Sequence, residues 1–160
     1  MIMDRTAPRR RGPRFVPAKE MKFAVESVVL LGRLYGRIVA TIRTALEASQ
    51  QDLADAMSSP ASTISKLESG QIVVGVHHLD LLAGAFNQLG SEVLPADPAW
   101  RGWELHQLAD EISTSLESDG FVVMWASPGD VEGKELVPER KLGALVRAAW
   151  PEGARKRIGW

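Results

Sequence analysis

Residues 49–70 read SQQDLADAMSSPASTISKLESG, two short amphipathic stretches separated by a polar interruption. Ser49 precedes the first stretch, and Asp52 lies three residues after Ser49. This is a capping-box pattern with aspartate in place of the usual glutamate, which marks the start of a helix. We therefore expect a helix over residues 50–57.

The interruption at residues 58–60 predicts a tight turn into a second helix. Pro60 suits the first turn of that helix, where its missing N–H costs no hydrogen bond. The second helix is expected over residues 61–68, and Gly70 suits the left-handed conformation that ends it. Ala54 is the small residue at which the two helices can touch. Such a pair forms a helix-turn-helix, whose second helix can enter the major groove of DNA.

Apolar residues at helical spacing flank this pair on both sides. A helix is expected from about Ala24 to Leu46, and another over residues 77–89, ending at Gly90. Their apolar faces comprise Leu34, Ile38, Ile42, Ala45, Leu46, Leu79, Leu82, Ala83 and Phe86.

Over residues 34–90 the chain resembles the Cro and phage-repressor helix-turn-helix family, also called the XRE family. The spacing between the matching blocks has no gap. The residues that carry the resemblance are Ile42 and Arg43, residues 49–54, residues 62–70, and Leu79, Leu82, Ala83 and Phe86. The resemblance implies a mainly α fold with a lambda-repressor-like DNA-binding domain, and a function in transcription regulation.

The resemblance also implies roles for single residues. Gln50 is expected to contact a DNA phosphate at a helix N-terminus, and Arg43 is expected to form a structural salt bridge with Glu68. Ala61, Ser62 and Lys66 take the outward, base-reading positions. The full set expected to contact DNA in this unit is Gln50, Gln51, Ser59, Ala61, Ser62, Thr63, Ser65, Lys66 and Ser69.

Two positions depart from the family pattern. Ser58 stands in the turn where glycine is common, so it must adopt an unfavourable backbone angle or let the turn relax. Ala61 is too small for the bidentate base contacts of glutamine or arginine. We therefore expect modest direct base readout from this helix.

Residues 1–20 carry five arginines among helix-breaking prolines, four of them within residues 9–14, and show no apolar periodicity. We predict a flexible basic arm that contacts the duplex, with a minor groove as one target. A tail that only aids solubility is the alternative. The arginines of this arm that are expected to contact DNA are Arg9, Arg10, Arg11 and Arg14.

After a proline-containing linker at residues 91–99, residues 100–160 predict a small α+β domain. Its expected elements are a helix on the apolar positions Trp103 to Leu116, a short β-hairpin of residues 121–126 and 135–137, and a helix over residues 142–150. Residues 155–157 are expected to be an exposed basic tail. The tryptophans expected at a dimer or partner interface are Trp100, Trp103, Trp125 and Trp150.

Composition narrows the function classes. The 160 residues include no cysteine, which excludes disulfides and cysteine-ligated zinc, and the formal net charge is -1. The adjacent His77 and His78 point to different sides of a helix, so no metal and no cofactor are expected. No catalytic motif is found, and an enzyme is not expected. With no membrane-length apolar run and an N-terminus unlike a signal segment, the protein is expected in the cytoplasm.

The helical domain of residues 21–90 and the unit of residues 100–160 together suggest a homodimeric repressor that binds double-stranded DNA. One alternative is an antitoxin-type interaction protein whose C-terminal unit binds a partner protein. A second alternative is a repressor that responds to a small molecule.

Overall fold

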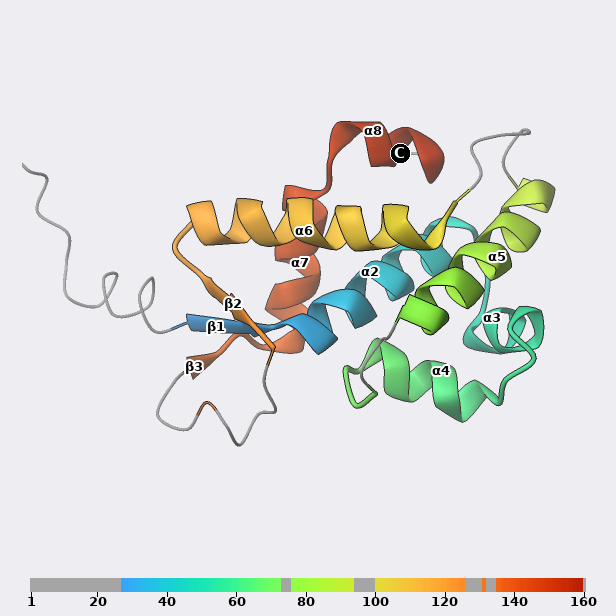
Figure 1. The fold of residues 1–160 in the computed structure, drawn as a ribbon, viewed down its shortest axis with the longest axis horizontal. Coiled ribbons are helices and arrows are strands. Elements are labelled where there is room, and N and C mark those ends of the chain that lie inside the picture. Colours follow the sequence, from blue (N-terminus) through green and yellow to red (C-terminus); the bar gives the residue numbers. More distant parts are fainter. Residues whose placement is uncertain (1–26, 73–75, 94–99, 126–130, 132–134, 160) are drawn as a thin grey trace, which may run out of the picture.

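The computed structural model describes residues 27–72, 76–93, 100–125, 131 and 135–159. Strand β1 (Ser27–Leu30) runs directly into helix α2 (Leu31–Ala45), which lies at the centre of the molecule (Figure 1). The later elements are α3 (Gln50–Ala56), α4 (Ala61–Glu68), α5 (Val76–Val93), α6 (Gly102–Ser118), β2 (Val122–Met124), β3 (Glu135–Leu136), α7 (Glu139–Ala149) and α8 (Glu152–Arg157). The fold is mainly α, with a small α+β part, as predicted.

Strand β1 corrects the prediction of a helix from about Ala24 to Leu46. All four of its residues are buried. Val28 and Leu30 pack with Val131 on one side, whereas Val29 joins the main core on the other. β-Branched residues favour such a two-sided buried strand, because their side chains pack well on a pleated surface. The helix therefore begins only at Leu31.

The small sheet has the order β2-β1-β3, and both outer strands run parallel to β1. Val28 pairs with Val122, and Ser27 pairs with Glu135. The predicted β-hairpin is therefore wrong, since its two strands lie on opposite sides of a strand from the N-terminal half. A tight hairpin requires adjacent antiparallel strands, and these strands are neither.

One hydrophobic core joins the two halves of the chain, reaching from Val29 to Ile158. Helix α5 continues through Gly90, where the sequence predicted its end, and packs against α6 (Figure 1). Within α5, the Asn87 side chain accepts a hydrogen bond from the backbone N–H of Trp100 and donates one to the Trp100 carbonyl. The core therefore does not divide at residues 91–99, where a linker was predicted.

Tyr35 connects α2 to the C-terminal half. Its hydroxyl forms a 2.8 Å hydrogen bond with Nδ1 of His106 on α6, and its ring stacks on Trp125 at a centroid distance of 5.9 Å. Burial, and then the charge of Asp110, raise the pKa of Tyr35 to about 12.

This pKa can be measured directly, because Tyr35 is the only tyrosine in the sequence. We expect phenolate absorbance to stay low through pH 10 in the folded protein and to appear near pH 10 in denaturant. The pKa of Tyr35 is higher in the folded than in the unfolded protein. Its contribution to the free energy of unfolding is therefore present in full below the unfolded pKa, and is lost as pH rises towards about 12. Tyr35→Phe provides the blank, and circular dichroism reports folding at each pH. If Tyr35 titrated at the same pH in the folded and the denatured protein, its burial against α6 and Trp125 would be contradicted.

Candidate nucleic-acid interface

Helix α3 begins with the predicted capping box. The Ser49 hydroxyl accepts a hydrogen bond from the Asp52 N–H, and Asp52 Oδ2 accepts one from the Ser49 N–H at 2.8 Å. The bond from the Ser49 backbone, followed by that from its side chain, lowers the pKa of Asp52. The carboxylate therefore stays charged at the positive end of the helix dipole, which fixes the start of α3.

The turn between α3 and α4 forms without glycine. Ser58 adopts a φ of +54°, so it takes the unfavourable backbone angle instead of relaxing the turn. The N–H groups of Ser58 and Ser59 close a Schellman motif on the carbonyls of Asp55 and Ala54. Ala54 is fully buried, in agreement with its expected place in the core of the helix pair.

Helix α4 has one buried and one exposed face. Ile64, Leu67 and Glu68 are buried, whereas the exposed residues of the helix are Ser62, Ser65 and Lys66. Ala61 and Thr63 are partly exposed. The helix has the predicted bounds, and Pro60 is its N-cap. Gly70, whose φ of +80° suits glycine, follows the C-cap Ser69 and terminates the helix in a second Schellman motif.

The buried end of α4 is held by the predicted ion pair. Nε and Nη2 of Arg43 donate to the two Glu68 carboxylate oxygens at 2.7 and 3.0 Å. Gln50 Nε2 donates to the same carboxylate at 3.0 Å. An amide NH₂ carries two hydrogens, so one donor of Gln50 is held by Glu68 and the second is left for another acceptor.

Sequence reasoning missed a further anchor of α4. Arg37 on α2 donates from Nη2 to the Glu68 carbonyl at 3.3 Å. Beside it, Gly36 lets α2 approach so closely that a Cβ there would lie 2.4 Å from the same carbonyl oxygen. The sequence does not show which helix crosses α4, so these contacts could not be predicted. The only signal for them was the position of Gly36 and Arg37 on α2.

Three other predicted contact residues use their side chains locally. Gln51 donates to Asp55 Oδ1 at 2.7 Å, on the exposed side of α3. The Ser69 hydroxyl donates to the Lys66 carbonyl at 3.0 Å, and that of Ser59 donates to the Met57 carbonyl at 3.4 Å. Arg9, Arg10, Arg11 and Arg14 lie outside the described residues.

The four tryptophans predicted at an interface separate into two pairs. Trp100 and Trp150 are buried in the core, so the prediction of an interface is wrong for them. Trp103 and Trp125 are 58% and 56% exposed. The predicted basic tail is also corrected, since residues 155–157 belong to α8 and Arg157 is tied to Glu104.

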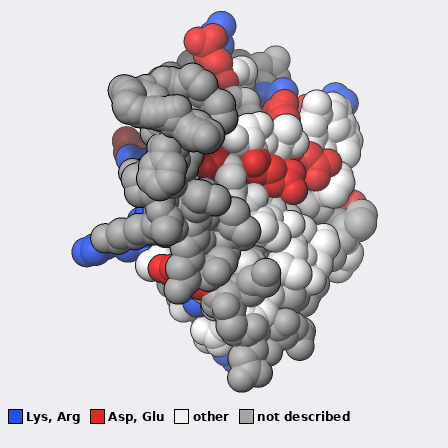
Figure 2. All heavy atoms as spheres, turned by 90° about the vertical axis from the view of Figure 1, so that its left-hand side faces the viewer, with Lys and Arg blue, Asp and Glu red and all other residues white. Residues whose placement is uncertain are grey.

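The face shown in Figure 2 lies away from α3 and α4. Its acidic side chains form a band across uncharged surface, with Lys and Arg mainly near the margins (Figure 2). Among the described residues, no helix is long and apolar enough to cross a membrane, and no three His, Asp or Glu side chains gather in a way that could hold a metal ion.

The arrangement of α3 and α4 defines a helix-turn-helix. Its second helix, α4, is anchored on its buried side and exposes its other face to solvent. Residues 39–92 match a family model described as helix-turn-helix. This segment is therefore a helix-turn-helix domain of the Cro and phage-repressor type, the XRE family, whose members are DNA-binding transcription regulators. No curated protein and no solved structure matches the chain.

Proposed function

We propose that the chain reads specific sequences in double-stranded DNA by placing α4 in the major groove. The observation that carries this proposal is the exposed face of α4, with Ser62, Ser65 and Lys66 in solvent and Glu68 anchored behind them. Gln50, at the N-terminus of α3, has one free amide hydrogen for a phosphate. The acidic band of Figure 2 lies on another face, which would repel a duplex.

Lys66 is the strongest candidate for base recognition, because a lysine can donate to the O6 and N7 atoms of guanine. We expect Lys66→Ala to lower affinity for an operator, selected from random DNA with the natural chain, by roughly tenfold. Affinity for unrelated DNA should fall much less. Fluorescence anisotropy at fixed salt measures both affinities.

The matched control is Lys156→Ala, which removes the same charge from an exposed position on α8. In Figure 1, α8 and α4 lie at opposite sides of the molecule. The control should leave both affinities nearly unchanged. Equal losses on operator and unrelated DNA in Lys66→Ala would assign this residue to phosphate contact.

We further propose that the regulator is a homodimeric repressor that acts in the cytoplasm, where its DNA lies. A single helix-turn-helix buries only about 600–1,000 Å² on DNA, so two copies on adjacent half-sites give firmer binding. The proposed dimer surface is the outer edge of β2, because Val122 and Trp125 are exposed there. A repressor of this kind would lower expression from a promoter that overlaps its operator.

Light scattering tests the dimer. The natural chain should have the mass of a dimer, and Trp125→Ala should shift the equilibrium towards the monomer by roughly tenfold or more, the effect of truncating an aromatic anchor. Trp103→Ala is the control, since it removes an equally exposed tryptophan on α6. A monomeric natural chain, with and without operator DNA, would contradict the proposal.

The exposed β2 edge also favours an antitoxin-type protein as a second candidate, with a different protein in place of the second copy. In that case the chain alone stays monomeric, and Trp125→Ala weakens a heteromeric complex. The experiment needs the whole chain, because β1 and α2 complete the core of the C-terminal half.

A further inference from the structure

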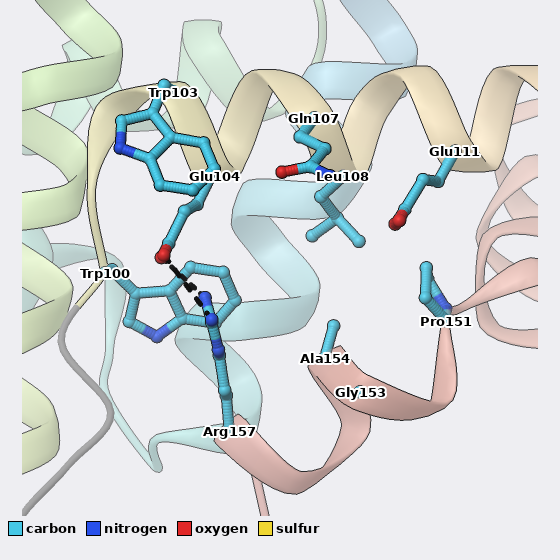
Figure 3. A pocket seen from close by; sticks show the side chains of 10 residues that line it. All are labelled: Trp100, Trp103, Glu104, Gln107, Leu108, Glu111, Pro151, Gly153, Ala154 and Arg157. Carbon is cyan, nitrogen blue, oxygen red and sulfur yellow. Dashed lines mark hydrogen bonds and ion pairs between the residues drawn. The ribbon is translucent and has the colours of Figure 1, made fainter.

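A pocket of about 260 Å³ lies between α6 and α8 (Figure 3). The buried side chains of Trp100 and Leu108 line it, and α8 closes one side. The remaining lining residues are Trp103, Glu104, Gln107, Glu111, Pro151, Gly153, Ala154 and Arg157. This volume is below the range of sites for drug-sized molecules, so it suits a smaller ligand.

Among the described residues that line the pocket, the one cation is already neutralised. The Arg157 guanidinium binds the Glu104 carboxylate with two nitrogens and lies 5.3 Å from the Trp100 ring centroid. Glu111 is exposed and has no ion-pair or hydrogen-bond partner among the described residues. The pocket therefore carries one uncompensated negative charge, and it attracts a cation.

The shape of the pocket specifies the rest of the ligand. Trp103 and Glu111 lie eight residues apart on α6, about 12 Å along the helix axis. Figure 3 shows them at opposite ends of the space, with Leu108 and Ala154 between them. An indole exposed at the rim gains contact area when an aromatic or alkyl group covers it. The site thus offers a charged end and an apolar end.

We propose that this pocket binds a small, elongated organic cation. Its protonated amine pairs with Glu111, and its aromatic or alkyl body lies along Leu108 and Ala154 towards Trp103. The Arg157 and Glu104 pair forms part of the wall and stays intact. The ligand class is set by the unpaired carboxylate at one end and the exposed indole at the other.

The pocket is connected to the helix-turn-helix through its floor. The Trp100 ring packs against Phe86 of α5 in an edge-on contact at a centroid distance of 6.4 Å, and α5 in turn packs on α3. A ligand in this pocket would therefore serve a small-molecule-responsive regulator. That use rests on the proposed DNA-binding function, whereas the binding test below contains no DNA and has an independent outcome.

Three probes with the same ring test the proposal on the full chain: 2-phenylethylamine as the cation, 2-phenylethanol as the neutral analogue and 3-phenylpropionate as the anion. Titration calorimetry should give a saturable Kd of about 1 mM or tighter for the cation. The neutral probe should bind roughly fivefold more weakly, and the anion more weakly still.

Two variants locate the binding. Glu111→Gln should lower the affinity for the cation to that for the neutral probe. Trp103→Leu should lower the affinities for the cation and for the neutral probe by roughly threefold or more. Glu117→Gln, an exposed change on α6 outside the pocket, is the control and should have no effect. Thermal unfolding verifies that each variant is folded. The proposal would be overturned if the three probes bound with equal affinity, or if the cation did not bind up to about 10 mM. It would also be overturned if Glu111→Gln left the affinity for the cation unchanged.

Discussion

Replacing Glu68 by alanine is expected to destabilise the protein by about 3–5 kcal/mol, the usual cost of removing one member of a buried ion pair. The Glu68 side chain is 4% exposed and that of Arg43 is 16% exposed. The substitution leaves the guanidinium without its carboxylate, and it also removes the acceptor of Gln50. Urea unfolding followed by circular dichroism measures the change.

The double variant Arg43→Met with Glu68→Leu distinguishes the loss of the ion pair from the cost of leaving the Arg43 charge without its partner. Two apolar side chains leave no unpaired buried charge, so this variant should recover a large part of the lost stability. Operator binding should not recover equally, since the bond that orients Gln50 is still absent. A loss below about 1 kcal/mol in Glu68→Ala would show that the pair behaves as a surface pair.

Replacing Gly36 by alanine is expected to cost about 3 kcal/mol, at the upper end of overpacking effects. The added Cβ would lie 2.4 Å from the Glu68 carbonyl oxygen and 2.7 Å from that of Leu67. Both atoms belong to the α4 backbone, which cannot swing aside as a side chain does. Helix α4 must therefore shift away from α2, and operator affinity should fall together with the free energy of unfolding.

Gly84→Ala is the matched control for this change. Gly84 lies inside α5, and among the described residues an added Cβ would meet no atom within 4 Å apart from the adjacent residues and the backbone of its own helix. Alanine is the better helix former, so we expect a gain of about 1 kcal/mol or less. If Gly36→Ala unfolded at the same urea concentration as the natural chain, the close crossing of α2 and α4 would be incorrect.

The sequence predicted the helix-turn-helix closely, because the signals there are local. The capping residues Ser49 and Asp52, the turn around Ser58, and Gly70 each act within a few residues, and the structure has each as expected. The pairing of Arg43 with Glu68 came from the family resemblance and is confirmed. The DNA contacts assigned to the exposed face of α4 stay predictions.

The C-terminal half was predicted less well, because its structure depends on distant residues. The β-branched residues of β1 are only a weak local signal for a strand, and its pairing with Val122 and Glu135 spans most of the chain. Helical spacing placed Trp103 on the apolar face of its helix, although it is exposed. Residues 155–157 looked like a charged tail, yet Arg157 pairs with Glu104 on α6.

The central place of β1 affects how the protein is made. This strand leads directly into α2, but both of its neighbours lie near the other end of the chain, at residues 122–124 and 135–136. Contacts between such distant residues form late, since a long loop must close first. During synthesis, the sheet beside α2 can form only after about residue 136 has left the ribosome. A prematurely terminated chain would lack this support, which favours its removal by proteases before it occupies an operator.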